Sequence, residues 1–233
     1  MEQERPRPLS SVNVVAFGIS EDELRVLLAR YRPAPGQPLA RQWALPGGLV
    51  EVDRDVDLVS CARRIVKAQT GVAGAYLEQL GGWGSAKRDP RGWSATQVYI
   101  ALISAECPIV PKAGNGDNAE WHVVECNGVG SPLVIDHGEI LTAAVKRLRG
   151  KSEYTSLPAF LLPDEFTLGE LQRAYEVVLG RQLEKSAFRT RVLTAELVTP
   201  LDRYREAANR PARLYRLSHR HPVYFPRSLQ SKA

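Results

Sequence analysis

Basic side chains gather near the C-terminal end of this 233-residue chain. Residues 181–233 hold 12 Lys and Arg against 4 Asp and Glu, whereas residues 1–150 hold 17 of each. A one-ended excess of positive charge suits contact with a polyanion, because Lys and Arg side chains can neutralise phosphates. A solvated basic surface would have the same composition, so the elements that carry these residues decide between the two interpretations.

Two helices are predicted where the chain enters this basic region. Thr167 and Glu170 form a capping-box pattern at the start of a helix over 168–179, and Gly180 is placed to end it. After a short turn, a second helix is expected at about 185–195. Two helices joined in this way are typical of a helix-turn-helix.

Two expected strands, 197–200 and 214–217, flank a polar tip over 202–213. Helix, turn, helix and β-hairpin in this order predict a winged helix-turn-helix, whose second helix enters the major groove of double-stranded DNA. The hairpin tip then meets phosphates or the minor groove. A solvated helix face and an ordinary surface loop are the alternatives. The expected DNA-binding residues are Lys185, Ser186, Arg189, Thr190 and Arg191 on the second helix and Arg203, Arg205, Arg210 and Arg213 at the tip.

The first 150 residues are expected to fold as a mixed α and β domain. Two β-rich runs, 12–17 and 24–29, are separated by a polar turn and predict a hairpin. A short strand from Trp43 is expected to end in a turn at Pro46-Gly47-Gly48. Further strands are expected at 76–80, 96–103 and 121–124, with one helix ending before Gly71 and another at about 136–148.

The segments LPGGLVE and RRIVKAQTG, on either side of the start of that first helix, resemble the Nudix hydrolase box. In that family, glutamates one helical turn apart hold Mg²⁺, and the metal polarises a diphosphate and activates water. Aligned on its final glycine, this chain keeps Arg64 but has Ile65, Ala68 and Gln69 where the family has glutamates. None of these three can act as a carboxylate ligand or base. The resemblance therefore implies the fold without the enzymatic activity, and no metal or cofactor is expected to be required.

The loop before this helix carries acidic residues at every second position, namely Glu51, Asp53, Asp55 and Asp57. Alternating Asp residues occur at the start of calcium-binding loops, but the glycine and glutamate that such a loop needs further on are absent here. The favoured interpretation is a solvated acidic loop in which Asp55 or Asp57 caps the helix.

Five further segments resemble, in the same order, the Nudix-related transcriptional regulators of NAD metabolism, the NrtR family. They lie within 81–93, 135–141, 166–172, 180–183 and 210–215. The resemblance implies an α+β protein with a Nudix-like α/β/α sandwich over 1–150 and a winged helix-turn-helix over 151–233. It further implies a homodimeric repressor of NAD biosynthesis or salvage genes that binds operator DNA and senses ADP-ribose or another NAD-derived dinucleotide.

The resemblance also indicates where a small-molecule effector would bind. Arg88, Asp89 and Arg91 would clamp phosphates or ribose, and a tryptophan would stack on adenine. The alternatives are a polar turn at 88–91, structural tryptophans, and an internal ion pair between Arg64 and Glu51. The implied ligand-binding residues are Trp43, Glu51, Arg64, Trp83, Arg88, Asp89 and Arg91.

Other classes of protein fit the sequence less well. The chain has no apolar run approaching about 18 residues and no signal-peptide pattern, so a cytoplasmic protein without a membrane contact is expected. Its three cysteines lack CxxC spacing, which argues against a disulfide framework or a cysteine zinc site.

The alternative function is a Nudix hydrolase that cleaves ADP-ribose or another nucleoside diphosphate derivative. Such an enzyme would have to use carboxylates displaced from the usual positions of the box.

Overall fold

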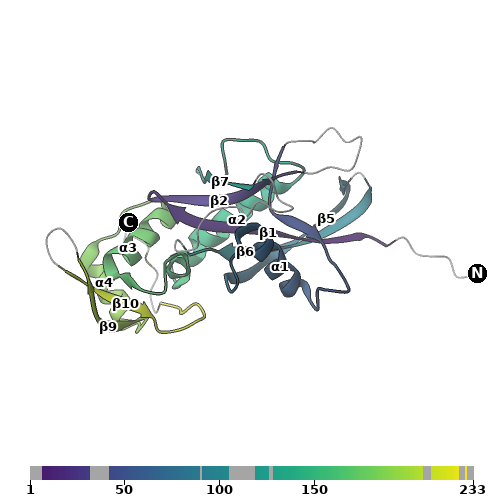
Figure 1. The fold of residues 1–233 in the computed structure, drawn as a ribbon. Helices are drawn as coiled ribbons and strands as arrows, with labels where there is room; N and C mark the ends of the chain where they lie inside the picture. The colour runs from purple at the N-terminus through teal and green to yellow at the C-terminus, as the bar shows by residue number, and fades with distance from the viewer. Residues whose placement is uncertain are drawn as a thin grey trace, which may run out of the picture.

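The computed structural model describes residues 7–31, 42–89, 91–104, 119–125, 128–206, 211–225 and 229. Among these residues, a larger domain with a seven-stranded sheet is followed by a smaller domain with a three-stranded sheet (Figure 1). No helix in this part of the chain is long and apolar enough to cross a membrane. The larger domain contains β1 (Leu9–Ser20), β2 (Glu23–Arg30), β3 (Trp43–Ala44), β4 (Gly47–Leu49), α1 (Leu58–Thr70), β5 (Tyr76–Asp89), β6 (Gly92–Leu102), β7 (Ala119–Val123) and α2 (His137–Ser152).

Strand β1 forms the centre of the larger sheet. It pairs antiparallel with β2 and β4 and parallel with β6. Its side chains alternate between two apolar layers, as expected for a strand that is buried on both faces. Val14 and Ala16 pack in the layer that contains α1, whereas Val15 and Phe17 pack in the layer that contains α2. The two helices therefore cover opposite faces of the sheet, which gives the predicted α/β/α sandwich.

Local sequence signals place the first hairpin and the ends of α1. Asp57 caps α1 by accepting a hydrogen bond from the backbone N–H of Ser60, and Gly71 ends the helix in the left-handed conformation at a φ of 75°. In the turn between β1 and β2, Glu21 and Asp22 have φ values of 54° and 60°. Positive φ values at both central residues are typical of a two-residue hairpin turn, because the backbone twist of such a turn matches the right-handed twist of the flanking strands.

The Pro-Gly-Gly segment that the sequence predicts as a turn instead contributes to strand β4. Gly47–Leu49 pairs antiparallel with Ser11–Asn13 of β1. A Cβ on Gly47 would lie 2.2 Å from Nδ2 of Asn13, whose side chain is held by Arg88 and Thr96, and 3.0 Å from the backbone oxygen of Val12, so this position favours glycine. The prediction of a turn is wrong at this point because glycine also permits a close backbone approach within a strand.

Several elements are longer than predicted because distant partners extend them. β5 continues to Asp89 rather than Leu80, since its glycine-rich half pairs with β6. α2 continues to Ser152, which is buried together with Leu148. Residues 151–163 contain the end of α2 and a short 3-10 helix, η1 (Leu157–Leu161).

The smaller domain contains β8 (Phe166–Thr167), α3 (Leu168–Leu179), α4 (Lys185–Thr194), β9 (Val198–Arg205) and β10 (Ala212–Leu217). Its order of helix, turn, helix and hairpin is the predicted one, and β8 adds a strand beside β10. Thr167 and Glu170 form the predicted capping box, and Gly180 ends α3 at a φ of 68°. The domain is a winged helix-turn-helix.

The two domains share apolar packing and are not separated by a free linker. Leu157 and Leu161 of η1 are buried in the core of the larger domain, whereas Ala159 between them is buried in the core of the smaller one. Val178 of α3 packs in the larger core, while Tyr175 of the same helix is buried in the smaller core. Because both segments contribute to both cores, we expect the domains to unfold together.

Leu161→Ala should lower the free energy of unfolding by about 2–5 kcal/mol, the usual cost of truncating a fully buried leucine. Differential scanning calorimetry should show one transition that shifts as a whole, because Leu161 anchors a segment shared by both cores. Val56→Ala is the control, since Val56 is 94% exposed and its truncation should change the stability by less than about 0.5 kcal/mol. Two separate transitions, of which only one shifts, would contradict the shared packing.

Candidate ligand pocket and nucleic-acid interface

A pocket lies where the first residues of β1, strand β4, the β5–β6 turn and the start of α2 come together. Its volume is about 170 Å³. Three of the predicted ligand-binding residues line it, and sequence reasoning missed other polar lining residues because they come from separate elements. The predicted residues in the lining are Arg88, Asp89 and Arg91, and the missed ones include Asn13, Ser94 and His137.

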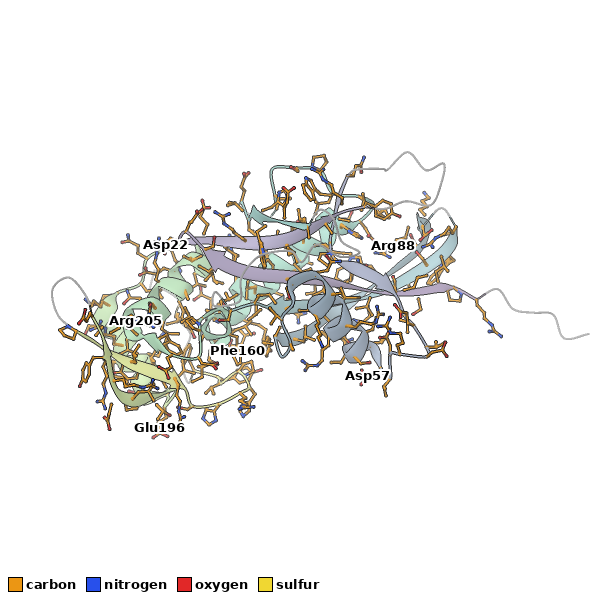
Figure 2. The ribbon with its side chains drawn as sticks, viewed as in Figure 1. Asp22, Asp57, Arg88, Phe160, Glu196 and Arg205 are labelled. Carbon is orange, nitrogen blue, oxygen red and sulfur yellow. The ribbon has the colours of Figure 1, made fainter. Side chains whose placement is uncertain are left out.

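Arg88 is a buried cation in the wall of this pocket. Its side chain is 7% exposed, and its Nε donates a hydrogen bond to Oδ2 of Asp136 at 2.7 Å. Its Nη2 donates to Oδ1 of Asn13 at 3.3 Å, and the same oxygen accepts a hydrogen bond from the Thr96 hydroxyl at 2.8 Å. A buried guanidinium is unfavourable without a counter-charge, so Asp136 stabilises it. Figure 2 shows Arg88 at the end of the larger sheet that is remote from Arg205 in the smaller domain.

Two buried polar atoms in this region make no hydrogen bond to the described part of the chain. They are the hydroxyl oxygen of Ser94, which lines the pocket, and Oδ1 of Asp136. Leaving a buried polar group unpaired costs about 1–3 kcal/mol. Ser94 thus adds to the pocket wall a hydroxyl with spare hydrogen-bonding capacity.

The imidazole of His137 faces the pocket from the first residue of α2. It is 5% exposed, and its Nδ1 accepts a hydrogen bond from the backbone N–H of Leu45 at 2.9 Å. Burial, together with the nearby charge of Arg88, lowers the pKa of His137 to about 4. The ring is therefore neutral at pH 7 with its proton on Nε2, and it ties the start of α2 to the chain beside β4.

Asp89 and Arg91 form a local pair at the β5–β6 turn. Nη2 of Arg91 donates to Oδ2 of Asp89 at 2.7 Å, and the backbone N–H of Arg91 donates to Oδ1 at 2.9 Å. These contacts with Arg91 lower the pKa of the Asp89 carboxyl. The Arg91 side chain is half exposed, so an anion in the pocket can approach its guanidinium from solvent.

Arg64 of the degenerate box is paired within the chain. Its Nε and Nη2 donate to the two oxygens of Asp55 at 2.8 and 2.6 Å, and its Nη1 lies 2.8 Å from Oε1 of Glu51. The hydrogen bonds from Arg64 hold the pKa of Asp55 well below its usual range. The ion pair with Glu51, weighed above as an alternative, is present, and neither residue lines the pocket.

The three box positions that lack glutamate lie on α1. Ile65 is buried in the apolar layer beneath the helix, whereas Ala68 is exposed and Gln69 is half-buried. In the part of the chain that the structure describes, no three His, Cys, Asp or Glu side chains are grouped so that they could hold a metal ion.

The tryptophans that were expected to bind the effector have structural neighbours. Trp43 is buried, its ring packs edge-on against His122 at 4.4 Å between centroids, and the guanidinium of Arg30 lies 3.5 Å from its ring centre. Trp83 packs against the core that contains α2. Neither tryptophan lines the pocket, so their contacts support the structural alternative.

Helix α4 carries a second concave surface in the smaller domain. Phe188 and Val192 are buried on its inner side, and Glu184 caps its start by accepting hydrogen bonds from two backbone N–H groups. A groove of about 390 Å³ runs along the outer side. It is lined by the predicted residues Lys185, Ser186, Arg189 and Thr190, together with Glu184 and Leu193. Arg191 lies on the same helix.

Three of the arginines predicted at the hairpin tip pair with carboxylates of the same domain. Such exposed ion pairs contribute little free energy, so these arginines can exchange their partners for phosphates. Arg210 lies outside the described residues. Sequence reasoning missed the acidic partners because two of them precede their arginines by 35 and 38 residues. The pairs are Arg203–Glu165, Arg205–Glu170 and Arg213–Asp202.

Asp55→Asn should destabilise the fold in a pH-dependent way. Because pairing with Arg64 depresses the folded pKa of Asp55, its contribution is present above the unfolded pKa of about 4 and is lost as the pH falls further. Urea unfolding of both proteins should therefore show the largest stability difference near pH 7 and a smaller one near pH 3. A difference that does not change with pH would contradict an ionised Asp55. Asp53→Asn, in the same loop, is the control.

Family models match both domains of the chain. The NUDIX domain matches residues 9–144, and the NrtR DNA-binding winged helix domain matches residues 158–217. The chain is 39% identical over 226 residues to the ADPR responsive transcriptional repressor NtrR of Acinetobacter baylyi (strain ATCC 33305 / BD413 / ADP1). That match covers 97% of this chain and 88% of the relative.

Solved structures show the same arrangement. Shewanella oneidensis NrtR complexed with a 27mer DNA matches with a TM-score of 0.82 and 34% identity, over 94% of this chain and 99% of that one. The NUDIX domain of Shewanella oneidensis NrtR complexed with ADP ribose matches with a TM-score of 0.53 and 29% identity, over 63% of this chain and 94% of that one. With its Nudix domain followed by a winged helix domain, this chain belongs to the NrtR family.

Proposed function

We propose that this chain is a transcriptional repressor that binds double-stranded operator DNA through α4. The observation that carries the proposal is the outer groove of α4, where Lys185, Ser186, Arg189 and Thr190 lie together. A helix of this kind fits the major groove, where Arg and Lys contact guanine edges. The Acinetobacter baylyi relative is named a transcriptional repressor, and the Shewanella oneidensis protein was solved with a 27mer DNA.

The hairpin β9–β10 supplies phosphate contacts in this proposal. Arg203, Arg205 and Arg213 would leave their carboxylate partners for DNA phosphates, which is a favourable exchange when condensed counterions are released. Arg191 of α4 would contact DNA from the same domain, and Arg210 stays a sequence-based prediction of a further contact. One winged helix reads only a few base pairs, so we propose a homodimer on a two-fold operator. A cytoplasmic location is part of the same proposal.

The effector in this proposal is ADP-ribose or another NAD-derived dinucleotide. Phosphates would pair with Arg88 and Arg91, and ribose hydroxyls would bond to Asp89 or Ser94. The pocket is smaller than the roughly 300–1,000 Å³ of typical ligand sites, so part of a dinucleotide would extend over the neighbouring surface. One relative is named ADPR responsive, and the Shewanella oneidensis NUDIX domain was solved with ADP ribose. The regulated genes would be those of NAD biosynthesis or salvage.

The larger domain is not a hydrolase in this proposal. The box positions of α1 hold Ile65, Ala68 and Gln69, and none of these side chains supplies a carboxylate to bind Mg²⁺ or to act as a base toward water. Glu51 and Asp55 are acidic residues near the box, but both are engaged by Arg64. Their carboxylates therefore stabilise the loop before α1.

Arg189→Ala should weaken binding to an operator duplex by about 1–3 kcal/mol and relax the sequence preference at one position, because a base contact is lost. Arg213→Ala should weaken binding to all sequences evenly and flatten the slope of log K against log salt by about one unit. Fluorescence anisotropy at several salt concentrations measures both effects, on an operator selected from random DNA by the wild-type protein.

Arg63→Ala is the matched control for these two variants, because Arg63 is an exposed arginine on α1 in the larger domain. Its affinity for the operator should equal that of the wild type. Unchanged operator affinity in both Arg189→Ala and Arg213→Ala would contradict the proposed DNA-binding surface.

ADP-ribose should bind to the protein and remain intact in the presence of Mg²⁺ or Mn²⁺. Isothermal titration calorimetry measures the binding, and chromatography of the nucleotide after prolonged incubation measures cleavage. We expect no AMP, because the carboxylates of the box are missing. Metal-dependent release of AMP that disappears in Glu51→Gln would show that displaced carboxylates carry out the hydrolysis.

A further inference from the structure

Helix α2 connects the ligand pocket to the DNA-binding domain. It has 16 residues and is therefore about 24 Å long. Its first residue, His137, lines the pocket, and its C-terminal part packs against α3 and η1. Near that end, Nε of Arg149 donates a hydrogen bond to the backbone oxygen of Val178 in α3. One helix thus connects the ligand pocket to the domain that carries the DNA-binding surface.

The start of α2 is held by the cation of the pocket. Asp136 occupies the N-cap position, where an Asp side chain normally accepts a hydrogen bond from the backbone N–H of the second or third helical residue. Asp136 makes no such bond. Its Oδ2 instead accepts the hydrogen bond from Nε of Arg88, and its Oδ1 is buried with no hydrogen-bond partner among the residues that the structure describes. The carboxylate therefore has two competing uses, namely pairing with Arg88 and capping its own helix.

We propose that the Arg88–Asp136 ion pair is the regulatory link between effector and DNA, an inference that rests on the proposed function. In one arrangement, Arg88 holds Asp136 and α2 begins without a side-chain cap. In the other, a phosphate of the effector pairs with Arg88, and Asp136 turns to accept the N–H groups at the start of α2. The effector distinguishes the two arrangements because only the second leaves Arg88 free for a phosphate.

The packing around α2 carries this change to the smaller domain. α3 also contacts the larger domain at the β1–β2 turn, where Nε of Arg173 lies 3.0 Å from Oδ1 of Asp22. Figure 2 shows Asp22 at the end of the sheet nearest the smaller domain. A shift of α2 along the sheet would therefore move α3, which packs against it, relative to β2, which α3 also contacts. Such a shift alters the orientation of α4, which follows α3 after a short turn.

Asp136→Asn tests the link because it keeps the size of the side chain and removes its charge. The readout is the ratio of the operator dissociation constants measured with and without saturating ADP-ribose. In the wild type, ADP-ribose should change the operator dissociation constant by at least about fivefold, whether it raises or lowers it. In Asp136→Asn, ADP-ribose should change this constant by less than about twofold. An amide at position 136 no longer pairs with the charge of Arg88 and can cap α2, so the variant without ADP-ribose should bind the operator as the wild type does with ADP-ribose. It should bind ADP-ribose equally or more tightly, since Arg88 is no longer held by a charge.

Glu139→Gln is the matched control, because Glu139 is an exposed carboxylate in the same first turn of α2, whereas Arg88 pairs with Asp136. Its ratio should equal that of the wild type. A wild-type ratio in Asp136→Asn would overturn the link while the proposed function stands. If ADP-ribose does not change the operator affinity of the wild type, the proposed effector and the link are both wrong. This measurement is made before any variant is prepared.

A measurement on the wild type keeps the test independent of the stability of the variant. Hydrogen exchange followed by mass spectrometry should show that ADP-ribose slows amide exchange at the start of α2, because the carboxylate of Asp136 then caps those N–H groups. Unchanged exchange over residues 136–141, at ADP-ribose concentrations where calorimetry shows saturation, would overturn the link.

Discussion

Burial of strand β1 on both faces is the constraint from which the larger domain follows. Residues 12–18 are all buried, so the strand needs an apolar layer on each side, and α1 and α2 supply these layers. Its first residues line the pocket, and the turn that follows it reaches the smaller domain through Asp22 and Arg173. The one polar residue within this buried run, Asn13, accepts hydrogen bonds from Arg88 and Thr96. The central strand thus also organises the pocket.

The degenerate Nudix box has kept its architecture with different contacts. In the catalytic version of the box, glutamates on the helix would gather around a metal ion. Here the retained Arg64 binds Asp55 and Glu51, and these pairs hold the loop of residues 51–57 against α1. Ile65, at one of the glutamate positions, packs in the apolar layer under the helix. The segment therefore stabilises the domain with an ion pair and an apolar side chain.

Features that depend on neighbouring residues could be predicted from the sequence, and features that depend on distant partners could not. The caps at Asp57 and Thr167 and the glycine ends of α1 and α3 are local, so their residue types indicate them directly. Strand β4 forms because Gly47 approaches Asn13, which no local pattern reveals. The partner of Arg88 lies 48 residues away in the sequence. The charge distribution and the order of the elements thus predict which surface an arginine belongs to. Its acidic partner can be identified only once the fold is known.

The shared packing restricts how a signal can pass between the domains. A free hinge would require separate cores, but η1 and α3 each place side chains in both. Opening such a junction would expose buried leucine and valine side chains, at a cost of about 1.5–3 kcal/mol for each one. Motion between the domains must therefore be a small sliding of packed helices that keeps these side chains buried. Helix α2 suits this motion, because it lies on one face of the sheet and its first turn is held by polar contacts that can be exchanged, namely those of Asp136 and His137.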